Sequence, residues 1–203
     1  MDIVFSKEEQ NVIKNADFFY HKKTAVDKII ARLNGLKGNI KTSTVFQNFH
    51  FLPEIDIDLG KISKGENYKG LPYLILDFPR FFHPKGIFAY RVMFWWGRGF
   101  YFTLHLSGVF LDFYKKALID AFESLKEQEI FLYQNKNDEW QHEMEMPYFQ
   151  LIDDCSKSDF EKWLDEVNFI KIGQKMPLER LSELENFGVN TFELLFDILK
   201  RQS

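Results

Sequence analysis

The chain has 203 residues, of which 45% are hydrophobic and 28% charged, and its net charge is −4 at pH 7. This balance is typical of a folded protein rather than a disordered chain, and the length favours one domain over residues 1–203. A general nucleic-acid binder needs a basic surface, so the negative net charge argues against nucleic acid as a partner.

The first expected element is helical. Ser6 and Glu9 have the spacing of a capping box, which opens a helix. Apolar residues then recur at steps of three and four as far as Leu33. One long helix or two shorter ones should end near Gly35, a suitable residue after a helix. The polar residues 37–44 should form a connection.

Strand signals follow. Residues 55–59 alternate between apolar side chains and carboxylates, which predicts a strand. Residues 60–70 are rich in lysine and glycine and predict a loop. A second strand is expected over 73–78, where Pro79 should end it or place it at an edge. Residues 81–86 should be a connection.

The most aromatic stretch predicts a β-hairpin of residues 87–96 and 100–107, joined by the loop 97–99. In this register one face is entirely apolar or aromatic, whereas a two-residue turn would mix polar and apolar side chains. Gly99 should supply the left-handed residue of the loop. The reverse face pairs Arg91 directly with His105.

The remaining elements follow in chain order: a helix over 111–126, a hairpin of strands 130–134 and 139–146 across the turn 135–138, a resumed strand over 148–152, a helix from Ser158 ending at Gly173, a helix starting at Pro177, and a last helix over 191–201. The expected fold class is α+β, a mostly antiparallel central sheet with helices at both termini and one mid-chain helix.

The sequence also indicates a location. No stretch reaches the roughly 18 apolar residues of a membrane span, and the first ten residues lack the pattern of a secretory signal. The single cysteine, Cys155, fits a reducing compartment. We expect a cytoplasmic protein without a membrane partner. The excess of Phe and Lys over Ala and Arg favours a bacterial source.

No complete catalytic or cofactor motif is present. Gly60 and Lys61 are not preceded by the glycine of a phosphate-binding loop, because position 55 is Ile. The one G-x-G, residues 97–99, lies between strands rather than before a helix. A single cysteine excludes zinc-ribbon ligation. No cofactor and no metal are expected.

Three smaller candidates each have a structural alternative that we favour. Asp56, Asp58 and Asp77 could converge on a hard cation or act as acid and base, or simply face solvent. Cys155 follows two aspartates, which raise the pKa of a thiol and so disfavour a nucleophile. His142 lies beside Trp and Met residues on an expected strand and fits a packed histidine.

The reverse face of the hairpin is the main candidate site. It combines a cation, a titratable ring and aromatic side chains: Arg91, His105, Trp95 and Tyr101. Arginine binds carboxylate or phosphate through paired donors, and aromatic rings stack on planar ligands. A covered, purely structural face, in which Arg91 and His105 meet a local acid, is the alternative.

Charge is unevenly distributed along the chain. Residues 59–99 contain seven Lys or Arg against two acids, and residues 123–166 contain thirteen acids against four lysines. Two unrelated solvated surfaces, an anion-binding middle, or pairing of the two regions would each account for this pattern.

The segment ISKGENYKGLPY, residues 62–73, resembles the S-K-x-x-x-Y-K segment of a group of uncharacterised bacterial proteins related in layout to the YktB-like proteins. The matching residues are Ser63, Lys64, Tyr68 and Lys69. The resemblance implies N-terminal helices, then this loop, then sheet strands, and implies no activity. The basic middle of the chain, not the resemblance, makes Lys64, Tyr68 and Lys69 the loop residues that an anionic ligand would contact.

We favour a non-enzymatic binding or interaction module that takes a small anionic ligand or a protein partner. The alternative is an enzyme, or the remnant of one, which acts on a small anionic or phosphorylated substrate with Arg91 as anion clamp and His105 as acid–base group. A nucleic-acid or toxin-neutralising partner protein is a third hypothesis.

Overall fold

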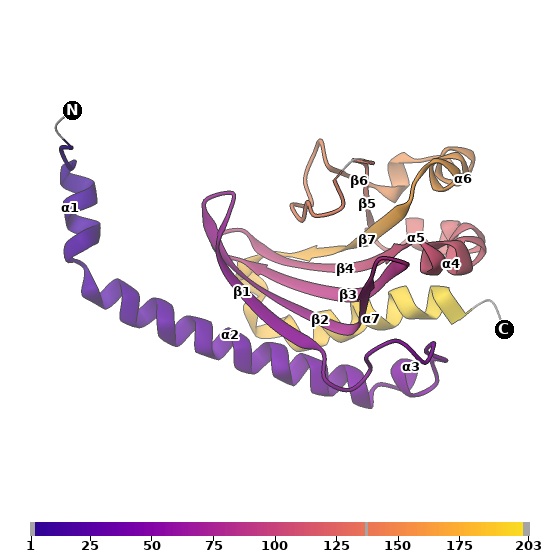
Figure 1. Cartoon of the computed structure of the whole chain (residues 1–203), viewed down its shortest axis with the longest axis horizontal. Helices are drawn as coiled ribbons and strands as arrows, with labels where there is room; N and C mark the ends of the chain where they lie inside the picture. Colours follow the sequence, from indigo (N-terminus) through magenta and orange to yellow (C-terminus); the bar gives the residue numbers. More distant parts are fainter. Residues whose placement is uncertain (1–2, 137, 201–203) are drawn as a thin grey trace.

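The computed structural model describes residues 3–136 and 138–200 (Figure 1). Its helices are α1 (Lys7–Lys14), α2 (Ala16–Thr42), α3 (Thr44–Gln47), α4 (Val109–Asp120), α5 (Phe122–Lys126), α6 (Lys157–Glu166) and α7 (Leu184–Leu199), with 3-10 turns η1 (Ile152–Asp154) and η2 (Leu178–Glu183). Its strands are β1 (Lys61–Tyr68), β2 (Leu71–His83), β3 (Gly86–Trp95), β4 (Gly99–Ser107), β5 (Phe131–Tyr133), β6 (Phe149–Leu151) and β7 (Phe169–Met176).

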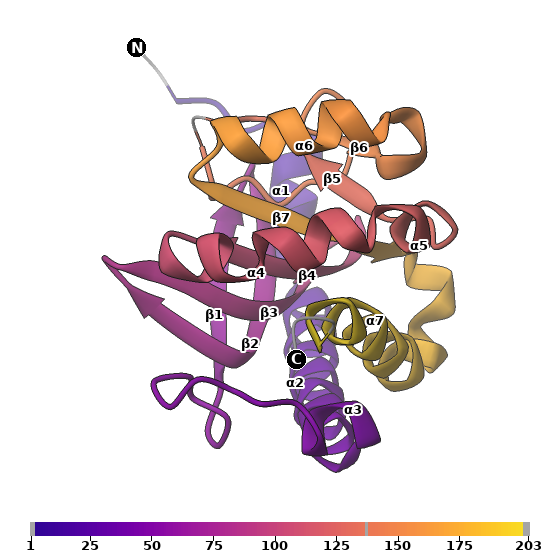
Figure 2. The same cartoon turned by 90° about the vertical axis from the view of Figure 1, so that its right-hand side faces the viewer.

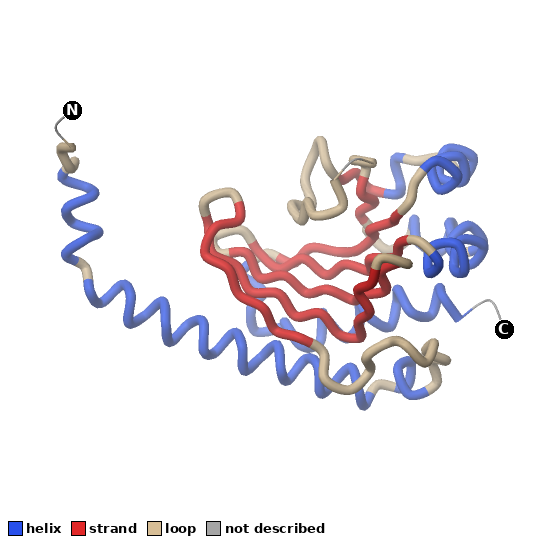
Figure 3. Tube along the Cα trace, viewed as in Figure 1, coloured by secondary structure: helices blue, strands red, loops and turns tan. Residues whose placement is uncertain are grey.

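The strands form one curved sheet (Figure 3). Their order is β1-β2-β3-β4-β7-β5-β6, and every neighbouring pair runs antiparallel. The last strand in the chain, β7, lies between β4 and β5. The expected α+β class is confirmed, with helices at both ends of the chain and in its middle.

Helices cover one face of the sheet, which holds the main hydrophobic core. Figure 2 shows α4, α7 and α2 against this face, with α6 beside α4. The even-numbered residues of β3 and β4 point into this core, because successive side chains of a strand alternate between faces. Figure 1 shows α2 and α7 running along the underside of the sheet.

The opposite face is covered by the chain between β5 and β6 rather than by a helix. We call residues 134–148, of which 137 is not described, the covering segment. A second, smaller core lies between it and the sheet, with Met93, Trp95 and Tyr101 from the sheet and Met144 from the covering segment. This layer encloses the polar reverse face of the β3–β4 hairpin.

The N-terminal expectation needs a correction at its end. The capping box of Ser6 and Glu9 starts α1 as predicted. However, α2 continues past Gly35 to Thr42, and residues 37–42 are helical rather than a connection. The reason is that Leu36 and Ile40 extend the buried stripe begun by Ile29 and Leu33, so burial continues for two further turns.

In residues 55–70 the predicted strand and the predicted loop are exchanged. The expected strand 55–59 makes only an isolated bridge to β2, because the carboxylate of Asp56 accepts the backbone N–H groups of Asp58 and Leu59 and closes a turn. The expected loop 60–70 contains β1. This strand lies at the edge of the sheet, where lysines and glycines replace the apolar alternation of a buried strand.

Pro79 does not end the second strand, which runs on through the expected connection to His83. The register between β2 and β3 shifts between Asp77 and Arg80. Pro79 is not at an open edge either, because Arg80 beside it pairs with Asp56 on one side and with Ala89 of β3 on the other. Pro79 lies at the bulge in the β2–β3 pairing, where a residue without an N–H fits.

The hairpin faces are as predicted, but the pairing is shifted by two residues. Arg91 lies opposite Thr103, and His105 lies opposite Ala89. The loop is 96–98 rather than 97–99, with Gly97 in the left-handed region at φ 70°. Gly99 instead allows close approach of β7, since a Cβ there would lie 2.8 Å from the carbonyl oxygen of Met176. A shift of two keeps every side chain on its face.

Several later predictions are wrong. The helix expected from Pro177 is the 3-10 turn η2, and the last helix, α7, begins at Leu184 rather than at 191. Residues 139–146 are not a strand; β5 pairs with β6, which lies within the predicted resumed strand 148–152. The helix from Ser158 ends at Glu166, not at Gly173, which lies in β7. The expected helix 111–126 is divided into α4 and α5. Asn137 of the expected turn and Arg201 of the expected last helix lie outside the described residues.

Candidate functional site

Four central strands place polar side chains on the face under the covering segment. Pairing runs from Asp77 to Arg91, from Arg91 to Thr103, and from His105 to Lys171. All five side chains are buried. Such a row of polar groups inside a protein requires partners for each charge, and the covering segment supplies most of those that the sheet lacks.

Arg91 of β3 and Asp77 of β2 form a buried ion pair with two contacts. Nε of Arg91 lies 2.7 Å from Oδ1 of Asp77, and Nη2 lies 3.0 Å from Oδ2. The guanidinium also lies over two aromatic rings, 5.6 Å from the ring centroid of Phe82 and 5.7 Å from that of Trp140. Its Nη1 atom faces the covering segment, 3.5 Å from Nε2 of His142.

Lys171 of β7 holds the covering segment through backbone oxygens. Lys171 is 1% exposed, and its ammonium donates to the carbonyl oxygens of Glu139, at 3.0 Å, and Gln141. Burial and, to a smaller extent, the positive charge of Arg91 together lower the pKa of Lys171 to about 7. Nδ1 of His142 lies 3.5 Å from this ammonium.

The two histidines of the face are held neutral. Burial, with the charges of Lys171 and Arg91, keeps the pKa of His142 well below its usual value. Burial likewise lowers the pKa of His105 to about 4, against the raising effect of Glu139. Nε2 of His105 lies 3.5 Å from Oε2 of Glu139, and neither ring nitrogen has a hydrogen-bond partner among the described residues.

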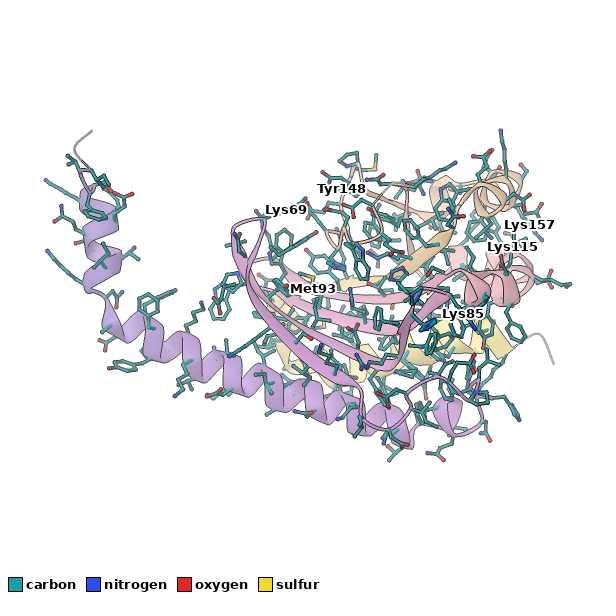
Figure 4. All side chains as sticks on the ribbon, viewed as in Figure 1. Lys69, Lys85, Met93, Lys115, Tyr148 and Lys157 are labelled. Carbon is teal, nitrogen blue, oxygen red and sulfur yellow. The ribbon has the colours of Figure 1, made fainter. Side chains whose placement is uncertain are left out.

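The tip of the β1–β2 hairpin fastens the covering segment at its other side. The Tyr68 hydroxyl accepts the backbone N–H of His142 at 2.8 Å. Lys69 forms an ion pair with Glu143 and lies 4.6 Å from the ring centroid of Tyr148. Figure 4 shows Lys69 at the hairpin tip facing Tyr148, with Met93 on the sheet below. This contact joins the basic middle of the chain to its acidic later third.

A pocket of about 500 Å³ lies between the sheet and the covering segment. This volume is in the range of small-molecule sites. The sheet contributes one polar group and an apolar and aromatic wall: Arg91, Tyr68, Tyr73, Ile75 and Met93. The covering segment contributes mainly polar side chains and one large ring: Asp138, Gln141, His142 and Trp140.

Of the six candidate residues, three line or support the pocket and three lie outside it. Arg91 and Tyr68 line the pocket, and Trp95 supports Tyr68 by donating from Nε1 to its carbonyl oxygen at 3.2 Å. Lys69 fastens the covering segment outside the pocket. His105 is buried beneath Glu139 and Trp140. Tyr101 lines a separate pocket with Arg98 and Glu145, and burial raises the pKa of Tyr101 to about 12.

Sequence reasoning did not identify Lys171, Trp140 or Gln141 as site residues, and it assigned His142 to packing. The alternation Phe169-Ile-Lys-Ile is the signal that could have placed Lys171 on a strand. The three candidate carboxylates do not converge, as favoured from the sequence: Asp77 pairs with Arg91, Asp56 with Arg80 and Asp58 with Lys41.

Comparisons of the chain with protein-family models, with curated proteins and with solved structures found no match. Among residues 3–136 and 138–200, no three His, Cys, Asp or Glu side chains gather as a metal site. Over the same residues, no helix combines the length and the apolar character that crossing a bilayer requires. The site's own geometry therefore carries the functional argument.

Proposed function

We propose that the protein is a cytoplasmic, non-enzymatic binding module, and that its pocket takes a small planar ligand with an anionic group. The observation that carries this proposal is the position of Arg91. Two of its nitrogens are bound to Asp77, while Nη1 faces the pocket wall formed by His142. Nη1 carries two N–H groups, so a carboxylate or phosphate oxygen could accept from the one that is not directed at His142.

The rest of the pocket fits the body of such a ligand. Tyr68, Tyr73 and Trp140 offer ring faces on which a planar group stacks. Gln141 offers both a donor and an acceptor in its side chain. Few polar groups among apolar and aromatic walls are typical of small-molecule sites, where the polar groups fix the orientation of the ligand.

Binding is better supported than catalysis by His105. This side chain is 1% exposed and does not line the pocket, so a substrate held there would not reach it. Its pKa of about 4 also leaves it unprotonated near neutral pH, so it could not act as a general acid. The alternative of an enzyme that uses Arg91 and His105 therefore has the weaker geometry.

Ligand-induced stabilisation tests the proposal. The full chain is melted with benzoate, adenosine monophosphate and inorganic phosphate as probes, and fluorescence of its tryptophans is followed in parallel. A planar probe present at 100 times its dissociation constant should stabilise the fold by about 2.7 kcal/mol. Inorganic phosphate, which has no ring, should bind more weakly. If neither planar probe raises the melting temperature, the proposal fails.

A paired replacement provides the matched variant. Changing Arg91→Met together with Asp77→Leu removes both charges and fills similar volume, which buried ion pairs often tolerate. This variant should fold and lose the effect of the planar probes. The same change at an exposed ion pair, Arg180→Met with Glu183→Leu, should keep it. Equal binding by both variants would show that Arg91 does not hold the anion.

A further inference from the structure

The N-terminal helices extend away from the rest of the molecule. We call residues 3–28, which comprise α1 and the first half of α2, the arm. Figure 1 shows the arm projecting beyond the sheet, with α1 turned away from the line of α2. Every residue from 3 to 21 is exposed, and the first buried residue of α2 is Ile29.

The arm nonetheless carries large apolar side chains. Eight of them are between 46% and 89% exposed: Ile3, Val4, Phe5, Val12, Ile13, Phe18, Phe19 and Tyr20. Scattered apolar side chains are normal on a surface, whereas a contiguous group of this size marks an interaction site. The rings of Phe18 and Phe19 contact each other, 5.3 Å between centroids, so part of the group is already clustered.

α1 receives little stabilisation from the rest of its own chain. An isolated helix of eight residues is unstable in water, because nucleation costs more than so few hydrogen bonds return. The capping box at Ser6 contributes about 1 kcal/mol, whereas the side chain of Asn15 caps α2. No residue of α1 within the described chain is buried, so burial against another surface would stabilise this helix.

The arm's charges are complementary to the same arm in reversed direction. Residues whose numbers sum to 31 would face each other in an antiparallel pair of arms centred near Asn15. In this register Glu8 meets Lys23 and Lys14 meets Asp17, whereas Lys22 is held by Glu66 of its own chain. Near the centre, Val12 meets Phe19 and Ile13 meets Phe18. A two-fold axis repeats each of these contacts.

We propose that the arm is a dimerisation surface and that its occupant is the arm of a second copy of this chain, antiparallel to the first. The eight exposed side chains present an apolar area on the order of the roughly 800 Å² that each partner of a stable complex buries. The contact is isologous, so complementary charges at its ends fix the direction and register of the pair.

Two other occupants fit less well. A helix that lies on an anionic membrane surface has mainly Lys and Arg on its polar face, whereas the first turn of α1 contains Glu8 and Glu9. An unrelated protein would not explain why the arm is complementary to a second arm that runs antiparallel to it. Both occupants are outcomes that the following experiments separate from a second copy.

The first experiment measures the mass of the full chain by sedimentation equilibrium, with expected reversible dimers. Changing Ile13→Asp together with Phe18→Asp should give monomers with an unchanged thermal unfolding transition of the body, because both side chains are exposed. Val109→Asp with Phe113→Asp, a pair of similar exposure on α4, is the control and should leave the dimer intact. A monomeric parent protein, or dimers in the arm variant, would overturn the proposal.

The second experiment uses charge reversal. Glu8→Lys alone and Lys23→Glu alone should each weaken the dimer about tenfold, because like charges then meet twice across the two-fold axis. Mixing the two variants should produce a mixed dimer in which both contacts are again between opposite charges. Lys28→Glu, which faces no acid in this register, is the control. Failure of the variants to associate with each other would rule out the antiparallel arm pair.

A third measurement separates lipid from protein. The full chain is sedimented with vesicles of phosphatidylcholine and phosphatidylglycerol, and it should remain in the supernatant. Vesicle binding that is lost on changing Ile13→Asp with Phe18→Asp would assign the arm to a lipid surface and overturn the dimer.

Discussion

Arg91 and Asp77 neutralise each other inside the molecule, from neighbouring strands and through two contacts of 2.7 and 3.0 Å. Both side chains are less than a tenth exposed. The pair fixes the plane of the guanidinium, so that Nη1 points to the covering segment and the pocket. It therefore serves both the folding of the sheet and the orientation of the proposed binding group.

Breaking this pair from one side should be costly. Asp77→Asn keeps the size of the side chain but leaves the buried Arg91 cation without its counter-charge, which typically costs about 3–5 kcal/mol of unfolding free energy. Denaturant unfolding measures this loss. Glu183→Gln, which breaks the exposed pair with Arg180, is the matched control and should leave the unfolding midpoint unchanged. Similar effects at the two sites would contradict the role given to burial.

Tyr68 should control how tightly the covering segment closes. Tyr68→Phe removes the oxygen that accepts the His142 N–H at 2.8 Å and leaves that donor unsatisfied, which costs about 1–3 kcal/mol. Amide hydrogen exchange should increase in residues 138–148 while β3 and β4 stay protected. Tyr20→Phe, at an exposed position on the arm, should change neither. Unaltered exchange in Tyr68→Phe would show that other contacts suffice.

The buried His105 should make stability depend on pH between 6.5 and 4. Burial lowers its folded pKa to about 4, whereas an unfolded histidine titrates near 6.5. As pH falls through this window the unfolded chain binds the proton first. The unfolding free energy therefore decreases, by up to about 3 kcal/mol for this group. The stabilising contribution of neutral His105 is fully present above pH 6.5.

Comparison with His105→Gln isolates this contribution. The difference in unfolding free energy between parent and variant should be constant above pH 6.5 and should change between pH 6.5 and 4. Carboxylates elsewhere in the chain contribute equally to both proteins and cancel. A difference that does not vary with pH would mean that the substitution had changed only packing.

Two glycines should respond oppositely to alanine. A Cβ on Gly173 would collide with the carbonyl oxygen of Phe102 in the neighbouring strand, so Gly173→Ala should lower the melting temperature sharply. Gly38 is exposed within α2, and a Cβ there meets nothing within 4 Å. Gly38→Ala should therefore stabilise by about 0.5–1 kcal/mol. Thermal unfolding of the two variants checks the contrast.

The sequence pattern predicted those features of the fold that are set by residues close together in the chain. The faces of the β3–β4 hairpin followed from the two-residue period of a strand, which does not depend on the choice of loop. The exact partners did depend on that choice, and Gly97 and Gly99 both suited a loop. Only the contact of Gly99 with Met176 of β7 distinguishes them, and it joins residues far apart in sequence.

The candidate site was predicted in part for the same reason. Arg91 was recognisable because it interrupts an apolar stretch. Its partners Asp77 and His142 come from β2 and from a segment without regular structure, and Lys171 comes from a strand that was expected to be helix. Contacts between segments far apart in the chain leave no periodic pattern in the sequence from which they could be predicted.

The ammonium of Lys171 binds the covering segment through the carbonyl oxygens of Glu139 and Gln141 rather than through their side chains. Every amino acid carries such an oxygen. The closure is therefore largely indifferent to which residues occupy these positions, and Gln141 can be exchanged without losing the attachment. If the pocket binds the proposed ligand, its preference can be changed one lining residue at a time while the anchoring stays intact.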